Sequence, residues 1–120
     1  MAAAALDYAR TRGWSVAIAI VDEAAQLAHF QRLEGAKAGS IETSIAKARS
    51  AALFNRPTKG LEDAVMGGRA VLMRLPQATP IQGGLPIRQD GALVGGIGVS
   101  GVLSPQDEEI AQAAIDALLR

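Results

Sequence analysis

The chain has 120 residues, a formal net charge of zero and no cysteine. This length predicts one domain over residues 1–120. The absence of cysteine excludes disulfides, zinc–cysteine sites and thiol nucleophiles. Proteins that bind nucleic acid usually carry a basic excess, so the balanced charge argues against that class. Aromatic residues make up only 3% of the chain, so we expect a core of aliphatic side chains and closely packed alanines.

The sequence contains no apolar run near the roughly 20 residues that a membrane-spanning helix needs. The first residues are apolar but lack the basic start of a signal peptide. We therefore expect a cytoplasmic protein without a membrane partner.

The first third of the chain predicts a helix followed by a β-hairpin. Residues 2–12 are rich in alanine and are expected to form a short helix that ends at Gly13. Residues 15–21 form an almost continuous apolar run, which is typical of a central strand. Residues 27–33 alternate between apolar and polar side chains and predict the second strand of the hairpin.

Two helices are expected next. Ser40 is the predicted cap of a helix that ends before Asn55, and Thr58 is the predicted cap of a shorter helix at about residues 59–66. Apolar side chains at helical spacing predict the buried face of the first of these helices: Ile41, Ile45, Ala48 and Ala52.

The last third predicts about three strands and a final helix. Residues 69–83 contain two prolines and give no clear pattern. Residues 85–89 and 93–100 flank Asp90-Gly91, a strong two-residue hairpin turn. Ser104-Pro105 is typical of a helix start. Because hairpins require antiparallel pairing, we predict an α+β fold in which helices cover an antiparallel sheet.

Two short motifs suggest catalysis or nucleotide binding, but their surroundings do not support either. The glycines of Gly96-Ile97-Gly98-Val99-Ser100-Gly101 match a dinucleotide-binding pattern, yet only one helix follows. We predict instead a strand that another backbone approaches closely. Ser44 and Lys47 match the nucleophile pair of serine acyl enzymes, but the partner motifs of those enzymes are missing. Lys47 is expected at the edge of the apolar stripe, solvated or in contact with a ligand.

The remaining candidates are single residues at or near strand ends. His29 is the only histidine, so a site of several histidines is excluded, whereas haem ligation by one histidine stays open. The alternative is a strand histidine that points to solvent or to the edge of the core. Asp22 and Glu34 are candidate catalytic bases or, alternatively, turn residues.

Several segments in fixed order resemble the GlcG/HbpS-like family, the haem-degrading domain also found at the end of PduO proteins. They are VAIAIVDEAAQLAHFQRLEGA, GSIETSIAKARSAALFNRPT, GGLPI and DGALVGGIGVSG followed by S-x-x-DE. The resemblance implies a profilin-like fold with a five-stranded antiparallel sheet and a homo-oligomer. It also implies a small-molecule ligand, with haem or a corrinoid as the specific candidates. Relatives that bind haem place the iron-ligating histidine in the N-terminal helix, where this chain has none; Tyr8 and His29 are the remaining candidate ligands.

An alternative function is a small cofactor-independent enzyme, an isomerase, lyase or hydrolase that acts on an anionic metabolite. Arg32 and Lys47 would then hold the anion, and the backbone amides of Gly83 and Gly84 would donate hydrogen bonds to it. Asp22, Glu34 or Lys47 would supply the acid–base group. The sequence leaves this alternative open beside the binding domain.

Overall fold

A computed structural model describes residues 1–119 and shows one antiparallel sheet. The two predicted hairpins are joined because β1 pairs with β4, which gives the strand order β2-β1-β4-β3. The α+β class is therefore confirmed. The bounds of the strands are β1 (Ala17–Asp22), β2 (Leu27–Arg32), β3 (Gly84–Gln89) and β4 (Ala92–Ser100).

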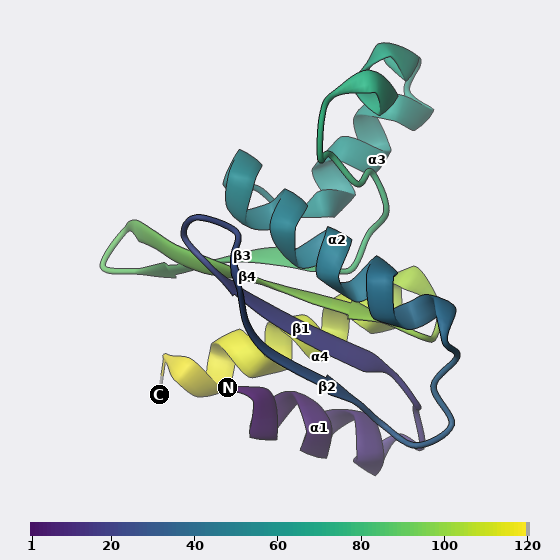
Figure 1. Ribbon diagram of the computed structural model, residues 1–120, viewed down its shortest axis with the longest axis vertical. Helices are drawn as coiled ribbons and strands as arrows, with labels where there is room; N and C mark the ends of the chain where they lie inside the picture. Colours follow the sequence, from purple (N-terminus) through teal and green to yellow (C-terminus); the bar gives the residue numbers. More distant parts are fainter. Residues whose placement is uncertain (120) are drawn as a thin grey trace.

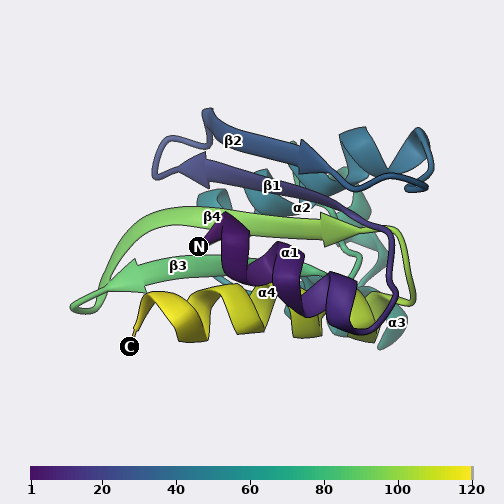
Figure 2. The same ribbon diagram turned by 90° about the horizontal axis from the view of Figure 1, so that it is seen from below.

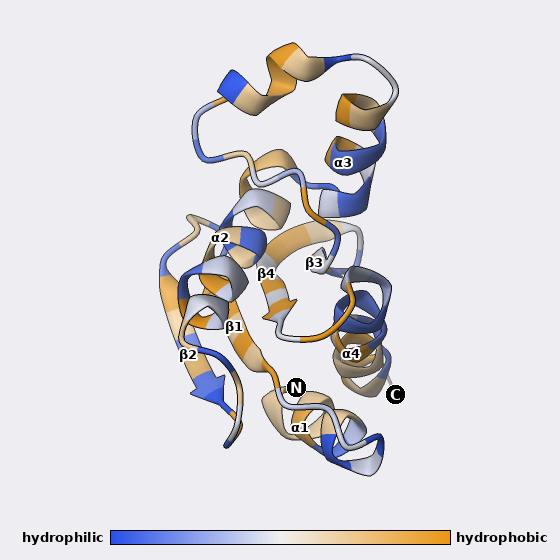
Figure 3. Ribbon diagram, turned by 90° about the vertical axis from the view of Figure 1, so that its right-hand side faces the viewer, coloured by the Kyte–Doolittle hydropathy of each residue, from blue (hydrophilic) through white to orange (hydrophobic). Residues whose placement is uncertain are grey.

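Helices cover both faces of this sheet. The first and last helices, α1 (Ala2–Thr11) and α4 (Ser104–Leu118), lie side by side on one face (Figure 2). Helix α2 (Gly39–Phe54) lies on the other face (Figure 1). Helix α3 (Thr58–Met66) and the 3₁₀ helix η1 (Ala70–Arg74) extend beyond the sheet as an arm (Figure 3). None of the helices formed by residues 1–119 has the length and apolar character that crossing a bilayer requires.

The resemblance implied five strands, but residues 1–119 form four, so the second half of the chain has two strands where about three were expected. The segment between η1 and β3 contains Pro76 and Pro80 and forms turns. Proline has no N–H to donate to a neighbouring strand, which explains why this segment adds no strand to the sheet.

The predicted N-terminal caps Ser40 and Thr58 were wrong, and Ser104 likewise begins its helix without capping it. The residues before the first helical turns are Ala38, Pro57 and Leu103, and no side-chain oxygen of theirs caps a helix. Ser40, Thr58 and Ser104 instead lie inside the first turns of α2, α3 and α4, because each helix begins at or before them. Their hydroxyl groups are thereby available for contacts other than helix capping.

Helix α2 packs unusually close to the sheet. A Cβ atom on Gly98 would collide with the carbonyl oxygen of Ser44, and one on Gly96 would collide with the carbonyl oxygen of Ala48. The backbone of α2 therefore approaches the glycines of β4 closely, as predicted for this strand. The same geometry corrects the predicted helix face, because Ile41 and Ile45 are only half-buried. The buried residues of α2 are mostly small: Ser40, Ser44, Lys47, Ala48, Ser50, Ala51 and Ala52.

Candidate functional site

Lys47 is buried in an ion pair. Its side chain and that of Asp107 on α4 are each 2% exposed, and Lys47 Nζ lies 3.1 Å from Asp107 Oδ2. Nζ also donates a hydrogen bond of 2.9 Å to the carbonyl oxygen of Val99. The expectation of a solvated lysine at the helix edge was therefore wrong. Ser44 donates its hydroxyl hydrogen to the Ile41 carbonyl, so Ser44 and Lys47 do not form a nucleophile pair.

The two glycines predicted as anion donors lie directly against Lys47. A Cβ atom on Gly83 would be 2.7 Å from Lys47 Nζ, and one on Gly84 would collide with the Lys47 carbonyl oxygen. The N–H of Gly84 donates to the hydroxyl of Thr58 at 2.9 Å, and the N–H of Val99 donates to the carbonyl oxygen of Gly83 at 3.0 Å. The structure thus brings Lys47, Gly83 and Gly84 together. The Lys47 ammonium and the Gly84 amide, however, already donate hydrogen bonds to other groups of the protein.

Arg32 and Asp22 lie apart from this cluster. Arg32 is exposed at the end of the edge strand β2, where it pairs with Ala17. Asp22 Oδ1 accepts hydrogen bonds of 2.9 Å from the N–H groups of Ala24 and Gln26. Asp22 therefore shapes the β1–β2 turn, which was the alternative to its role as a base.

Glu34 lines a surface pocket of about 310 Å³ at the end of α1. The other lining residues are Arg10, Gly13, Trp14, Ser15 and Leu33. The hydroxyl of Ser15 donates to the carbonyl oxygen of Glu34 at 3.0 Å, which ties the β2–α2 connection to the start of β1. We call this the N-terminal pocket. It combines an aromatic ring, an aliphatic side chain and one charge of each sign.

Tyr8 and Arg12 lie beside this pocket. The Arg12 guanidinium lies 3.6 Å from the centre of the Tyr8 ring and 5.9 Å from that of Trp14. The Tyr8 hydroxyl donates to Glu109 Oε2 at 3.0 Å. Desolvation, followed by this hydrogen bond, raises the pKa of the Tyr8 phenol above its ordinary value of 10.0. The phenolate that iron would need is therefore disfavoured at Tyr8.

His29 is exposed on β2, opposite Ile20. Within residues 1–119, no group of three or more histidine, aspartate and glutamate side chains could hold a metal ion.

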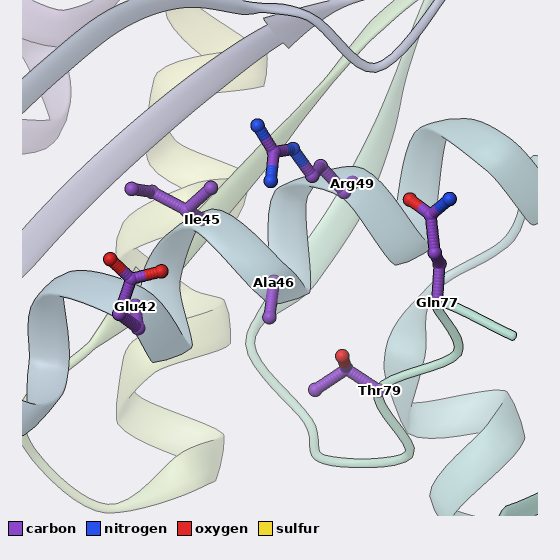
Figure 4. Close-up of a pocket in the computed structure, with 6 residues that line it drawn as sticks. All are labelled: Glu42, Ile45, Ala46, Arg49, Gln77 and Thr79. Carbon is purple, nitrogen blue, oxygen red and sulfur yellow. The ribbon is translucent and has the colours of Figure 1, made fainter.

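A second pocket, of about 160 Å³, lies between α2 and the segment that leads to β3 (Figure 4). Ile45 and Ala46 supply its apolar lining, and its polar groups come from Glu42, Arg49, Gln77 and Thr79. We call it the α2 pocket. Sequence reasoning missed it because residues 69–83 carry no legible pattern. Ile45 was predicted to lie on the buried face of α2, so no signal in the sequence pointed to this pocket.

The profile of the family described as "Haem degrading protein HbpS-like" matches residues 1–116. This chain belongs to the HbpS-like family. Protein GlcG of Escherichia coli is 38% identical over 98 residues, which cover 82% of this chain and 73% of GlcG. The confirmed resemblance therefore extends over almost the whole chain.

Two solved structures of HbpS-like proteins share the fold. A double mutant of Streptomyces reticuli HbpS superposes with a TM-score of 0.90 at 32% identity, over 98% of this chain and 80% of that one. The crystal structure described as the PduOC:Heme complex superposes with a TM-score of 0.88 at 31% identity, over 97% of this chain and 87% of that one. One HbpS-like domain of this shape is thus known with haem bound.

Proposed function

We propose that this HbpS-like chain is a tetrapyrrole-binding domain whose specific ligand is haem. The observation that carries the proposal is the similarity to the PduOC:Heme complex, at 31% identity and a TM-score of 0.88. Membership of the family described as haem degrading gives further support. Because one fold can serve several functions, the proposal also needs a site on this chain that suits the ligand.

The N-terminal pocket supplies groups that suit haem. Haem is a flat, largely apolar macrocycle with two carboxylates on one edge. Trp14, which is half-buried, offers an aromatic face for offset stacking on the ring, whereas Leu33 lines the pocket but is only 8% exposed. Arg10 offers a planar cation that pairs with carboxylate. Haem would supply an iron centre here, and this chain would hold the ring face and the carboxylate edge.

The size of this pocket limits what one copy of the chain encloses. Sites for drug-sized ligands span roughly 300–1,000 Å³, and the N-terminal pocket has about 310 Å³. Because a cavity of about 150 Å³ holds a molecule the size of benzene, this volume accommodates only part of a haem, and one copy would leave the rest of the macrocycle exposed. We infer that a second copy covers this rest, in agreement with the expected homo-oligomer.

Iron ligation by α1 is not part of this proposal. That helix contains no histidine, and the Tyr8 hydroxyl is bound to Glu109. His29 on β2 is the remaining candidate iron ligand, and its role can be tested separately. We expect His29→Ala and Tyr8→Phe to retain haem binding, because stacking and the carboxylate contact hold the ring.

The test is a titration of Trp14→Ala and Arg10→Gln with haemin, followed by the Soret band. Each variant should bind haem at least tenfold more weakly than the unmodified chain, a loss of about 1.4 kcal/mol. Arg74→Gln is the matched control, because Arg74 lies on η1, away from the N-terminal pocket. Unchanged affinity in both pocket variants would place the haem site elsewhere on the chain.

A further inference from the structure

The α2 pocket is lined by two oppositely charged side chains, Glu42 and Arg49, of which only the Arg49 Nε–H is hydrogen-bonded to another group of residues 1–119. Among residues 1–119, the Glu42 carboxylate and the Arg49 guanidinium form no ion pair. Figure 4 shows both side chains on one side of α2, with Gln77 and Thr79 on the connecting segment. We propose that this pocket binds a small carboxylate that also carries an ammonium group. This ligand is independent of haem.

Arg49 is suited to hold the carboxylate. Its Nε–H donates to the carbonyl oxygen of Ala25 at 3.2 Å, which fixes the guanidinium at the β1–β2 turn. Within residues 1–119 its two terminal nitrogens donate no hydrogen bond, which leaves their N–H groups available to a ligand. A guanidinium presents a planar fork that matches the two oxygens of a carboxylate, so a single arginine provides a bidentate contact.

Glu42 selects for an ammonium group on the same ligand. It lies seven residues before Arg49, which places both on one face of α2, about 10 Å apart along the helix axis. One positive and one negative side chain leave the pocket lining without net charge. The Glu42 carboxylate would repel a phosphate dianion, whereas it would attract and pair with an ammonium group. The lining thus favours a zwitterion over a simple anion.

The volume and the walls limit the size of the ligand. The pocket has about 160 Å³, and an apolar cavity of about 150 Å³ is large enough to hold benzene. A ligand of roughly six to eight non-hydrogen atoms therefore fits. Ile45 and Ala46 would contact its methylene groups. The wall opposite α2 is fixed because the N–H of Thr79 donates to the Ser50 hydroxyl at 3.0 Å.

The experiment is a nuclear magnetic resonance titration of the full chain with 4-aminobutyrate, butyrate and butylamine as probes. These three molecules differ only in which charged end they carry. We expect saturable shifts at α2 and residues 77–79, and at least tenfold tighter binding of 4-aminobutyrate than of either comparator. Arg49→Gln should weaken 4-aminobutyrate binding at least tenfold. Glu42→Gln should remove the preference for 4-aminobutyrate over butyrate.

Controls separate this proposal from the haem proposal. Arg74→Gln should bind 4-aminobutyrate as the unmodified chain does, because Arg74 lies outside the α2 pocket. Arg49→Gln should keep its haemin titration, and Trp14→Ala should keep its 4-aminobutyrate titration. The inference is overturned if no probe gives saturable shifts at this pocket, if the three probes bind equally, or if Arg49→Gln binds 4-aminobutyrate with unchanged affinity.

Discussion

Lys47 on α2 and Asp107 on α4 form an ion pair at the edge of the sheet, with each side chain 2% exposed. The pair connects helices on opposite faces of the sheet, next to the point where β3 begins (Figure 1). Asp107 is held further because its Oδ1 accepts the N–H of Val102 at 3.2 Å. A buried charge without its partner is costly, so each member of the pair depends on the other.

The first prediction concerns this dependence. Lys47→Met should lower the free energy of unfolding by about 3–5 kcal/mol, because it leaves the Asp107 carboxylate buried without a counter-charge. Urea unfolding of the purified variant measures the change. The double variant Lys47→Met/Asp107→Asn should lose clearly less than the sum of the single variants. Additive losses would mean that the two groups do not interact.

The second prediction concerns pH. Burial raises the pKa of the Asp107 carboxyl above its ordinary value of 3.8, and the Lys47 ammonium opposes this shift. The folded state thus binds the proton more readily than the unfolded state. The stabilisation that results from this proton binding is fully present at pH values below the pKa of Asp107 in the unfolded chain. It is lost as the pH rises through the pKa of Asp107 in the folded chain. Relative to Asp107→Asn, the unmodified chain should therefore gain stability as pH falls from neutral toward that ordinary value. A difference in unfolding free energy that does not vary with pH would contradict this.

The third prediction uses the close approach of α2 to β4. Gly98→Val should destabilise the fold by more than about 2 kcal/mol, because its side chain would displace the α2 backbone. Gly39→Ala is the matched control, since a Cβ atom there has nothing within 4 Å and lies at the start of α2. The control should be neutral or slightly stabilising. A Gly98→Val variant with the melting temperature of the unmodified chain would show that the contact is loose.

The fourth prediction concerns assembly. The arm of α3 and η1 exposes Met66, Val71 and Met73 at 81%, 64% and 63%, and exposed apolar surface of this kind marks interaction sites. We expect light scattering to give a symmetric homo-oligomer at micromolar concentration. The double variant Val71→Asp/Met73→Asp should reduce the mass toward that of one 12.4 kDa chain. A monomer mass for the unmodified chain would refute the expected assembly.

Much of the fold could be predicted because its signals are local. Asp90 and Gly91 have φ values of 53° and 81°, which are the left-handed conformations that their hairpin turn requires. The alternation in residues 27–33 and the apolar run before it predicted the first hairpin in the same way. Gly98 correctly indicated a close backbone approach, because a glycine in the interior of a strand often marks a site where another backbone comes near.

The arrangement around Lys47 could not be predicted, because it depends on residues far apart in the chain. The predicted face of α2 relied on its large aliphatic side chains, Ile41 and Ile45. Because α2 approaches β4 closely, the helix face that contacts the sheet carries small residues such as Ser44 and Ala48. The two isoleucines therefore lie toward the side of the helix and are only half-buried. Lys47 then points at Asp107, 60 positions later, a pairing for which helical periodicity offers no signal.

The most direct measurement of the central claim is an absorption titration of the unmodified chain with haemin. The tetrapyrrole proposal predicts a shifted Soret band that saturates at a fixed ratio of haem to chain and persists after gel filtration. A spectrum that stays that of free haemin at every protein concentration would contradict it.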